Sequence, residues 1–151
     1  MQVCRRSPPG VQPFAAKSAK FIQSFSAIGL IPDSGGTWHL PRLVGQARAL
    51  ALALTGEPLP AERAAEWGLI WKAVEDDALD AEVDAIAAKL TSLPPLGLAA
   101  IKDMIRSSWQ YSLDEELERQ AGAMRRLGFT EDYREGVAAF LEKRQPTFKG
   151  R

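Results

Sequence analysis

The hydrophobic pattern beyond residue 45 is mostly that of amphipathic helices. Gln46 to Leu54 is rich in alanine and leucine and stops at Thr55-Gly56, a glycine signal for a helix end. Pro60 suits the first position of a second helix, which Gly68 ends. Leu69 to Val74 is a short apolar run between turn residues, and such a run is typical of a strand.

Further helices are predicted toward the C-terminus from apolar stripes at helical spacing. In order, these stripes are Leu79, Val83, Ile86 and Leu90; Leu98, Ile101, Ile105 and Trp109; and Tyr133, Val137, Phe140 and Leu141. Asp76 or Asp77 can cap the first of these helices, and Thr130 can cap the last. Ser112 followed by Glu115 has the pattern of a capping box, which predicts a helix start there.

A cluster of turn residues, Pro32-Asp33-Ser34-Gly35-Gly36, follows the apolar run from Phe21 to Ile31. Pro32 biases Ile31 away from helical backbone. Asp33 or Ser34 can cap the short helix that follows, which is predicted to run through Leu43, and Pro41 must either lie in its first turns or break it. The two glycines allow a positive φ or a close approach of the backbone. Spacing alone therefore makes Asp33 a helix cap more readily than a catalyst.

Composition narrows the class of protein. The chain has 151 residues, 46% of them apolar and 25% charged, as in an ordinary soluble globular domain. Lysine plus arginine equals aspartate plus glutamate at 19 each, so no bulk charge favours nucleic acid or a membrane surface as partner. No apolar run approaches the ~18 residues of a membrane span. We expect a cytoplasmic protein, and the single cysteine, Cys4, excludes an internal disulfide.

The segment from Phe21 to Trp38 resembles the part of crotonase-superfamily enzymes that ends in Gly-Leu-x-Pro-x-x-Gly-Gly-Thr. Further motifs follow at the family's spacing: Leu40-Pro41-Arg42-Leu43-Val44-Gly45, Leu54-Thr55-Gly56-Glu57-Pro58, Ala64-x-x-Trp67-Gly68-Leu69-Ile70, and Asp132 to Arg144. Together they extend the resemblance from Ala15 to Arg151. It implies an α/β crotonase spiral fold, of which this chain would be the helix-rich C-terminal portion.

The resemblance also divides the chain. Residues 15–75 would end the crotonase core and contain the catalytic turn, and residues 76–151 would form a C-terminal helical oligomerisation region. Residues 1–14, with Pro8-Pro9 and no periodicity, match nothing in the family and are expected to be loose.

Within the superfamily, the sequence is most similar to the isomerases of bacterial phenylacetate breakdown, which carry Pro-Asp-Ser-Gly-Gly-Thr-Trp and Tyr-Arg-Glu-Gly-Val-Ala-Ala-Phe. Those enzymes interconvert the ring-epoxide and oxepin forms of a coenzyme A (CoA) thioester. Hydratases of the superfamily have a second glutamate eight residues before the position of Asp33, where this chain has Phe25. A phenyl ring cannot deprotonate water, whereas one carboxylate suffices to move a proton between two carbons. The resemblance therefore implies an isomerase with Asp33 as its acid/base group.

Removal of a proton α or γ to a thioester carbonyl needs a positioned base and a stabilised enolate oxygen. Apolar neighbours such as Phe25, Ile28 and Leu30 would favour the protonated form of Asp33, and a nearby helix N-terminus would favour the ionised form. The sequence leaves this balance open.

The resemblance further implies contacts with the substrate by Phe25, Ile31, Pro32, Gly35, Gly36, Trp38, Phe140 and Lys143. Trp38 either lines a pocket for an aromatic acyl group or packs in the interior. Phe140, Lys143 and Arg144 either lie near the CoA adenine and phosphates or form a solvated basic helix end. His39, the only histidine, is expected to be a surface or packing residue. Trp67, Trp71 and Trp109 are expected to be core or subunit contacts.

No metal or redox cofactor is implied, because CoA is part of the substrate, and the family's assemblies imply a homotrimer or hexamer. The superfamily's two backbone donors to the thioester oxygen lie in N-terminal motifs that this sequence lacks. We therefore expect a truncated, impaired gene product, since one lost oxyanion donor removes on the order of 3 kcal/mol of transition-state stabilisation. The alternatives are an enoyl-CoA hydratase and a non-catalytic fragment that only associates with full-length subunits.

Overall fold

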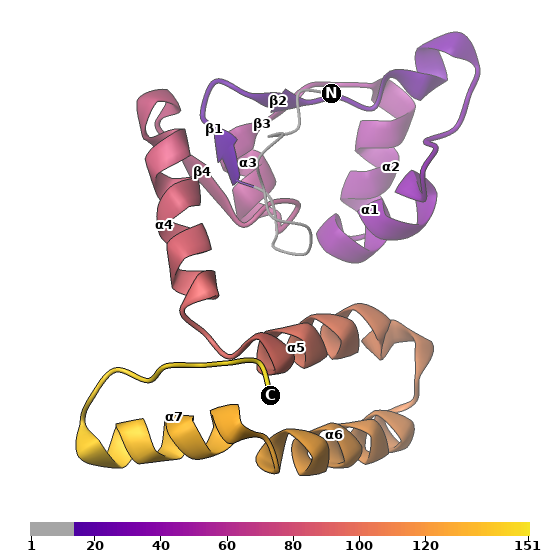
Figure 1. The fold of residues 1–151 in the computed structure, drawn as a ribbon. Helices are drawn as coiled ribbons and strands as arrows, with labels where there is room; N and C mark the ends of the chain where they lie inside the picture. The colour runs from indigo at the N-terminus through magenta and orange to yellow at the C-terminus, as the bar shows by residue number, and fades with distance from the viewer. Residues whose placement is uncertain (1–13) are drawn as a thin grey trace. The chain divides into compact units, whose positions relative to one another are not determined.

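The computed structural model describes residues 14–151, which form two compact units, one up to Ala85 and one from Ile86 onward (Figure 1). The α-helices are α1 (Gly36–Val44), α2 (Gln46–Thr55), α3 (Ala61–Glu66), α4 (Leu79–Thr91), α5 (Pro95–Ser107), α6 (Leu113–Gly128) and α7 (Glu131–Glu142). The strands are β1 (Phe14–Ala16), β2 (Lys20–Phe21), β3 (Leu59–Pro60) and β4 (Lys72–Val74), and 3₁₀ turns cover Ser24–Ile28, Asp76–Ala78 and Ser108–Gln110. The expected loose segment lies outside the described residues, apart from Phe14, which begins β1.

Two short strand pairings close the first unit. β1 runs parallel to β4, with Phe14 opposite Lys72 and Ala16 opposite Val74. The N–H of Lys17 extends this pairing by donating to the carbonyl of Val74 at 2.9 Å. β2 runs antiparallel to β3. Both ends of the segment that contains α1, α2 and α3 are therefore tied together.

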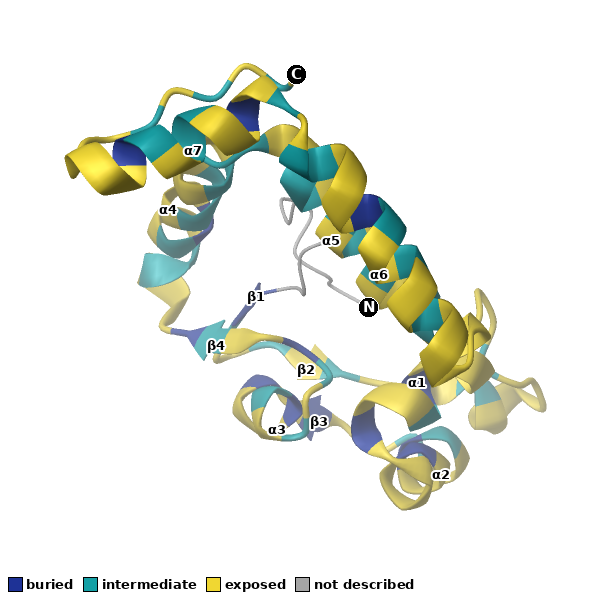
Figure 2. Ribbon diagram, turned by 90° about the horizontal axis from the view of Figure 1, so that it is seen from below, coloured by how far each residue is buried: buried dark blue, intermediate teal, exposed yellow. Residues whose placement is uncertain are grey.

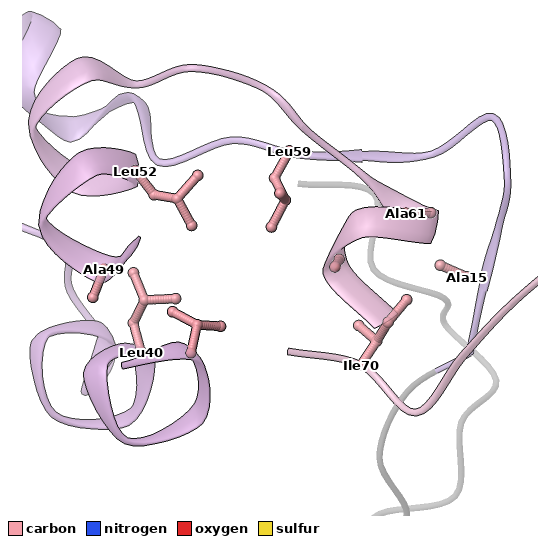
Figure 3. Close-up of a cluster of buried hydrophobic side chains, with 9 residues drawn as sticks. Ala15, Leu40, Ala49, Leu52, Leu59, Ala61 and Ile70 are labelled. Atoms are coloured by element: carbon pink, nitrogen blue, oxygen red, sulfur yellow. The ribbon is translucent and has the colours of Figure 1, made fainter. Parts of the chain in front are cut away.

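The core of the first unit combines alanines with larger aliphatic side chains (Figure 3). Its buried members are Ala15, Leu40, Val44, Ala49, Leu52, Leu59, Ala61, Ala64 and Ile70. Because Ala61 and Ala64 are completely buried, α3 can approach the strands closely. Trp67 and Phe21 pack against this cluster, which confirms the prediction that Trp67 is a core contact.

The helix ends of the first unit follow the sequence signals closely. α2 ends before Gly56, as predicted. α3 begins one residue later than predicted, because Pro60 is its N-cap residue. Only Lys72–Val74 of the predicted strand pairs with another strand.

The expectation that Asp76 or Asp77 caps α4 was wrong. Asp76–Ala78 form a 3₁₀ turn ahead of α4, and the Asp76 carboxylate accepts a hydrogen bond from the backbone N–H of Ser18 at 3.1 Å. The side chain therefore joins the β1–β2 loop to the start of α4.

Helix caps in the second unit confirm the sequence predictions. The Ser112 hydroxyl accepts a hydrogen bond from the N–H of Glu115 at 3.4 Å, and the Glu115 carboxylate accepts one from the N–H of Ser112 at 2.7 Å. This reciprocal pair forms the capping box at the start of α6. The Thr130 hydroxyl accepts a hydrogen bond from the N–H of Tyr133 at 3.1 Å and caps α7.

The predicted apolar stripes of α5 and α7 lie on helices but remain largely exposed within the described chain (Figure 2). Ile105 on α5 is 69% exposed and Phe140 on α7 is 82% exposed. An open apolar groove of about 770 Å³ lies between α5, α6 and α7, lined among others by Leu96, Phe129, Val137 and Phe148. Exposed apolar surface of this extent is typical of a face that contacts protein, ligand or membrane.

Residues 144–151, which we call the C-terminal strap, run back along α7 (Figure 1). The carboxylate of Asp132, only 4% exposed, accepts hydrogen bonds from the N–H groups of Lys149 at 2.6 Å and Gly150 at 2.8 Å. One turn further along α7, the Glu135 carboxylate accepts a hydrogen bond from the N–H of Thr147 at 2.8 Å. Two acidic side chains on one helix thus hold the backbone of the strap.

The strap gives a prediction about acid stability. Hydrogen bonds from Arg144 and Thr147 lower the pKa of Glu135 from 4.5 to about 2. Because the folded-state pKa is depressed, this carboxylate stabilises the fold above pH 4.5, and we expect the contribution to disappear as the pH falls from about 4.5 to 2. Urea unfolding measured across this range should show Glu135→Gln with a shallower dependence of unfolding free energy on pH than the unchanged chain. Glu118→Gln, an exposed site on α6, should leave the dependence unchanged, and equal slopes for all three proteins would contradict the prediction.

Candidate functional site

Asp33 lies on a turn whose shape is set by left-handed backbone. We call residues 32–36 the Asp33 turn. Ser34 has φ 49° and Gly35 has φ 78°, and the N–H of Gly36 donates to the carbonyl of Asp33 at 2.7 Å. The N-cap residue of α1 is Gly35, and no side chain caps this helix. The expectation that Asp33 or Ser34 caps the helix was therefore wrong, because Gly35, which has no side chain, occupies the N-cap position.

Each of the two positions in the turn requires glycine for a different structural reason. Gly35 adopts the left-handed conformation, which glycine does without steric cost. Gly36 has no such requirement, but a Cβ there would lie 2.9 Å from the Cβ of Pro32. The close approach that Gly36 allows is therefore within the turn, between Pro32 and the first residue of α1. Contact of either glycine with substrate stays a prediction.

Ser34 is a strained residue, since a non-glycine residue in the left-handed region costs ~1–3 kcal/mol and persists only when its surroundings fix it. Residues of this kind are concentrated at functional sites. The strained residue lies directly after Asp33.

The Asp33 carboxylate is exposed and makes no hydrogen bond or ion pair with residues 14–151. Ile28 is 72% exposed, Leu30 59% and Ile31 74%, so these neighbours do not enclose the carboxylate as expected. No described element of the first unit lies over them. Phe25 is half-buried in the 3₁₀ turn, and its carbonyl accepts the N–H of Leu30 at 3.0 Å. Any enclosure of Asp33 must therefore come from protein or substrate beyond these side chains.

Trp38, His39 and Arg42 form a cluster on α1, just after the Asp33 turn. The Arg42 guanidinium carbon lies 4.1 Å from the centre of the Trp38 ring, and its Nη1 donates to the Trp38 carbonyl at 3.0 Å. The imidazole of His39 meets Trp38 edge-on, with 4.8 Å between ring centres. Trp38 remains 39% exposed. His39 is a packing residue at the surface, as expected, whereas no sequence pattern predicted that Arg42 stacks on Trp38.

Phe140 and Lys143, the other predicted substrate contacts, belong to the second unit. Lys143 ends α7 in the left-handed conformation, and its ammonium makes no ion pair with residues 14–151. Arg144 is different, because its guanidinium binds both oxygens of Glu135, at 2.6 and 2.9 Å, and donates to Glu142 at 2.6 Å. Of the two cations, only Lys143 is thus available for an external anion.

Two classes of site find no support in the described residues. Among residues 14–151, no group of three or more His, Cys, Asp or Glu side chains is placed to hold a metal ion. No helix in the same part of the chain combines the length and apolarity that crossing a membrane requires.

Comparisons with known proteins identify relatives along nearly the whole chain. The family described as enoyl-CoA hydratase/isomerase matches residues 13–151. The chain is 50% identical to the 1,2-epoxyphenylacetyl-CoA isomerase of Escherichia coli K12, over 91% of this chain and 52% of that protein. It is 48% identical to a probable enoyl-CoA hydratase of Rhodobacter capsulatus, over 91% of this chain and 53% of that protein. The crystal structure of an enoyl-CoA hydratase from Bacillus anthracis superposes with a TM-score of 0.88 at 36% identity, over 91% of this chain and 54% of that one.

The chain therefore spans about half the length of the curated relatives that it matches. The superposition confirms the crotonase-type fold for the matched part, with a helix-rich composition as predicted. The relatives include both an isomerase and a hydratase, so the likeness alone does not choose between the two reactions.

The contact between Pro32 and Gly36 gives a prediction about stability. Gly36→Ala places a methyl group against the Pro32 ring, which cannot rotate away, so we expect a loss of about 1–3 kcal/mol of unfolding free energy. Gly128→Ala on α6 is the matched control, because a Cβ there meets nothing within 4 Å and alanine favours helix. Urea unfolding of both variants measures the difference. Equal stabilities for the two variants would contradict this account of the turn.

Proposed function

Because the chain belongs to the enoyl-CoA hydratase/isomerase family, we propose that it carries the acid/base carboxylate of an acyl-CoA isomerase, Asp33. The observation that carries the proposal is the combination of residue types at two positions, Asp33 and Phe25. An exposed carboxylate stands on a strained turn at Asp33, and an apolar ring, Phe25, stands where hydratases of the family have their second glutamate. The substrate is a CoA thioester, and the reaction isomerises a double bond or a ring epoxide, in catabolism of the phenylacetate or fatty-acid type.

One carboxylate is enough for this chemistry. The Asp33 carboxylate accepts a proton from one carbon of the acyl chain, while the C–H electron pair shifts toward the thioester carbonyl. The carboxyl group then returns the same proton to another carbon, and the electron pair forms the C–H bond there. The double bond changes its place, and no atom is gained or lost. Neither a metal nor a redox cofactor takes part, and CoA enters only as part of the substrate.

Support for an isomerase comes from the identity of 50% with a protein named 1,2-epoxyphenylacetyl-CoA isomerase. Hydration is the second candidate, favoured by the R. capsulatus relative, which is named a probable enoyl-CoA hydratase. Hydration needs a group that deprotonates water, and the half-buried ring of Phe25 cannot do so.

A third candidate is a fragment without catalysis that joins full-length subunits of the family. The exposed apolar faces of α5 to α7 favour an association of this kind, and the same faces suit the homotrimer or hexamer that we propose for the whole protein. Size-exclusion chromatography with and without a full-length relative separates a subunit that forms mixed assemblies from one that does not.

The role of Asp33 is tested in a hybrid in which this chain replaces the 137 residues that it matches in the E. coli relative. We expect Asp33→Asn to lower kcat for isomerisation by about 10²- to 10⁴-fold, since the amide cannot accept the proton. Asp77→Asn, an exposed aspartate of the same unit, is the control and should leave kcat unchanged. Unchanged turnover in Asp33→Asn would end the proposal.

The choice between isomerase and hydratase is tested at Phe25 in the same hybrid. We expect the unchanged hybrid to hydrate crotonyl-CoA at no more than a trace rate, and Phe25→Glu to raise that rate by at least about tenfold, because the added carboxylate can act on water. Phe25→Gln has a similar size and no base, so it should show no gain. Hydration of crotonyl-CoA by the unchanged hybrid at the rate of a hydratase would favour the second candidate.

A further inference from the structure

The Asp33 turn contains strained backbone that needs support from its surroundings. Ser34 has φ 49°, and the N–H of Gly36 closes the turn by donating to the carbonyl of Asp33 at 2.7 Å. A non-glycine residue keeps a left-handed conformation only where the surrounding structure fixes it. The side chains that pack against the turn therefore decide how firmly it holds the Asp33 carboxylate in place.

His39, on α1, contacts the turn with both its backbone and its side chain. Its N–H donates to the carbonyl of Gly35 at 2.9 Å. A Cβ on Gly35 would lie 3.1 Å from Cδ2 and 3.4 Å from Nε2 of the imidazole, so the ring lies on the side of Gly35 where other residues carry a side chain. The residue that follows Ser34 is thus held at its carbonyl and beside its Cα by the same residue of α1.

The imidazole of His39 is itself supported by its neighbours on α1. It meets the Trp38 ring edge-on, with 4.8 Å between ring centres and an angle of 84° between the planes. The Trp38 ring in turn lies 4.1 Å from the guanidinium carbon of Arg42. Edge-to-face contact favours one orientation of a pair of rings over others. Although His39 is exposed, its ring is therefore placed between Trp38 and the backbone of Gly35.

We propose that His39 is a positioning residue for Asp33, a role that rests on the proposed function and adds a residue to it. The ring keeps Ser34 and Gly35 in their left-handed conformations, and this backbone holds the carboxylate where it acts on the substrate. The imidazole acts by its flat shape and transfers no proton. A displacement of about 1 Å can cost a reaction about 10²-fold in rate, so a loosened turn lowers kcat more than it weakens binding.

The effect on the turn is tested in the full chain by hydrogen exchange, with glycine labelled by ¹⁵N and carbonyl ¹³C. Gly35-Gly36 is the only pair of adjacent glycines in the sequence, so only the Gly36 N–H is bonded to a labelled carbonyl, which identifies its signal. We expect His39→Ala to speed exchange of this N–H by at least about fivefold, because its hydrogen bond to Asp33 opens more often. His39→Phe keeps a flat ring and should exchange like the unchanged chain. Gln46→Ala, an exposed site at the start of α2, is the control and should also change nothing. Unchanged positions of the other glycine signals show that each variant is folded.

The effect on catalysis is tested in the hybrid with the E. coli relative. We expect His39→Ala to lower kcat for isomerisation by about 10- to 100-fold with KM within about twofold, and His39→Phe to keep kcat within about threefold. In a hybrid that already carries Asp33→Asn, His39→Ala should lower kcat no further, because it acts through Asp33.

Three results would overturn the inference: unchanged exchange and kcat in His39→Ala, a loss in His39→Phe as large as in His39→Ala, or a full further loss in the Asp33→Asn background. Failure of the proposed function would show differently, as unchanged turnover in Asp33→Asn alone, while the effect of His39→Ala on exchange at Gly36 remained.

Discussion

The parallel pairing of β1 with β4 is the constraint on which the first unit depends. It joins Phe14–Ala16 to Lys72–Val74 and so closes the segment that carries the Asp33 turn, α1, α2 and α3. The antiparallel pairing of β2 with β3 closes a second ring inside the first. Short strands pair weakly by themselves, and the alanine-rich cluster beside them supplies the apolar contacts that hold them. A single core thus supports both the strands and the helix that follows Asp33.

The sequence predicted those features in which the two interacting groups lie within a few residues of each other along the chain. The caps at Ser112 and Thr130 join a side chain to a backbone N–H three residues away, so a short motif contains the whole interaction. Prediction failed at Asp76, whose partner Ser18 is far away in the sequence, and no local pattern can show such a contact. The α5 and α7 stripes were correct as helices, whereas their exposure depends on what packs against them, which periodicity does not contain.

The sequence indicated residues for the candidate site, whose roles stay predictions, but not the geometry of the Asp33 turn. The motif around Asp33 indicated the acidic residue, and Gly35 and Gly36 predicted a turn with unusual backbone geometry. The left-handed conformation of Ser34 had no signal in the sequence, because serine seldom adopts it, and the N-cap position of α1 belongs to Gly35 and not to Asp33. At this helix start backbone carbonyls replace a side-chain cap, since the N–H groups of Gly36 and Trp38 donate to the carbonyls of Asp33 and Gly35.

The C-terminal strap has a consequence for any shortened version of the chain. Lys149 and Gly150 lie beyond the last helix, yet their N–H groups are the only described partners of the Asp132 carboxylate. Deleting them would remove both N–H donors from the Asp132 carboxylate and leave water in their place. It would also uncover Gly136, because the ring of Phe148 lies only 3.6 Å from the position that a Cβ on Gly136 would take. A stop codon before residue 147 would therefore destabilise α7, although no residue of the helix itself is changed.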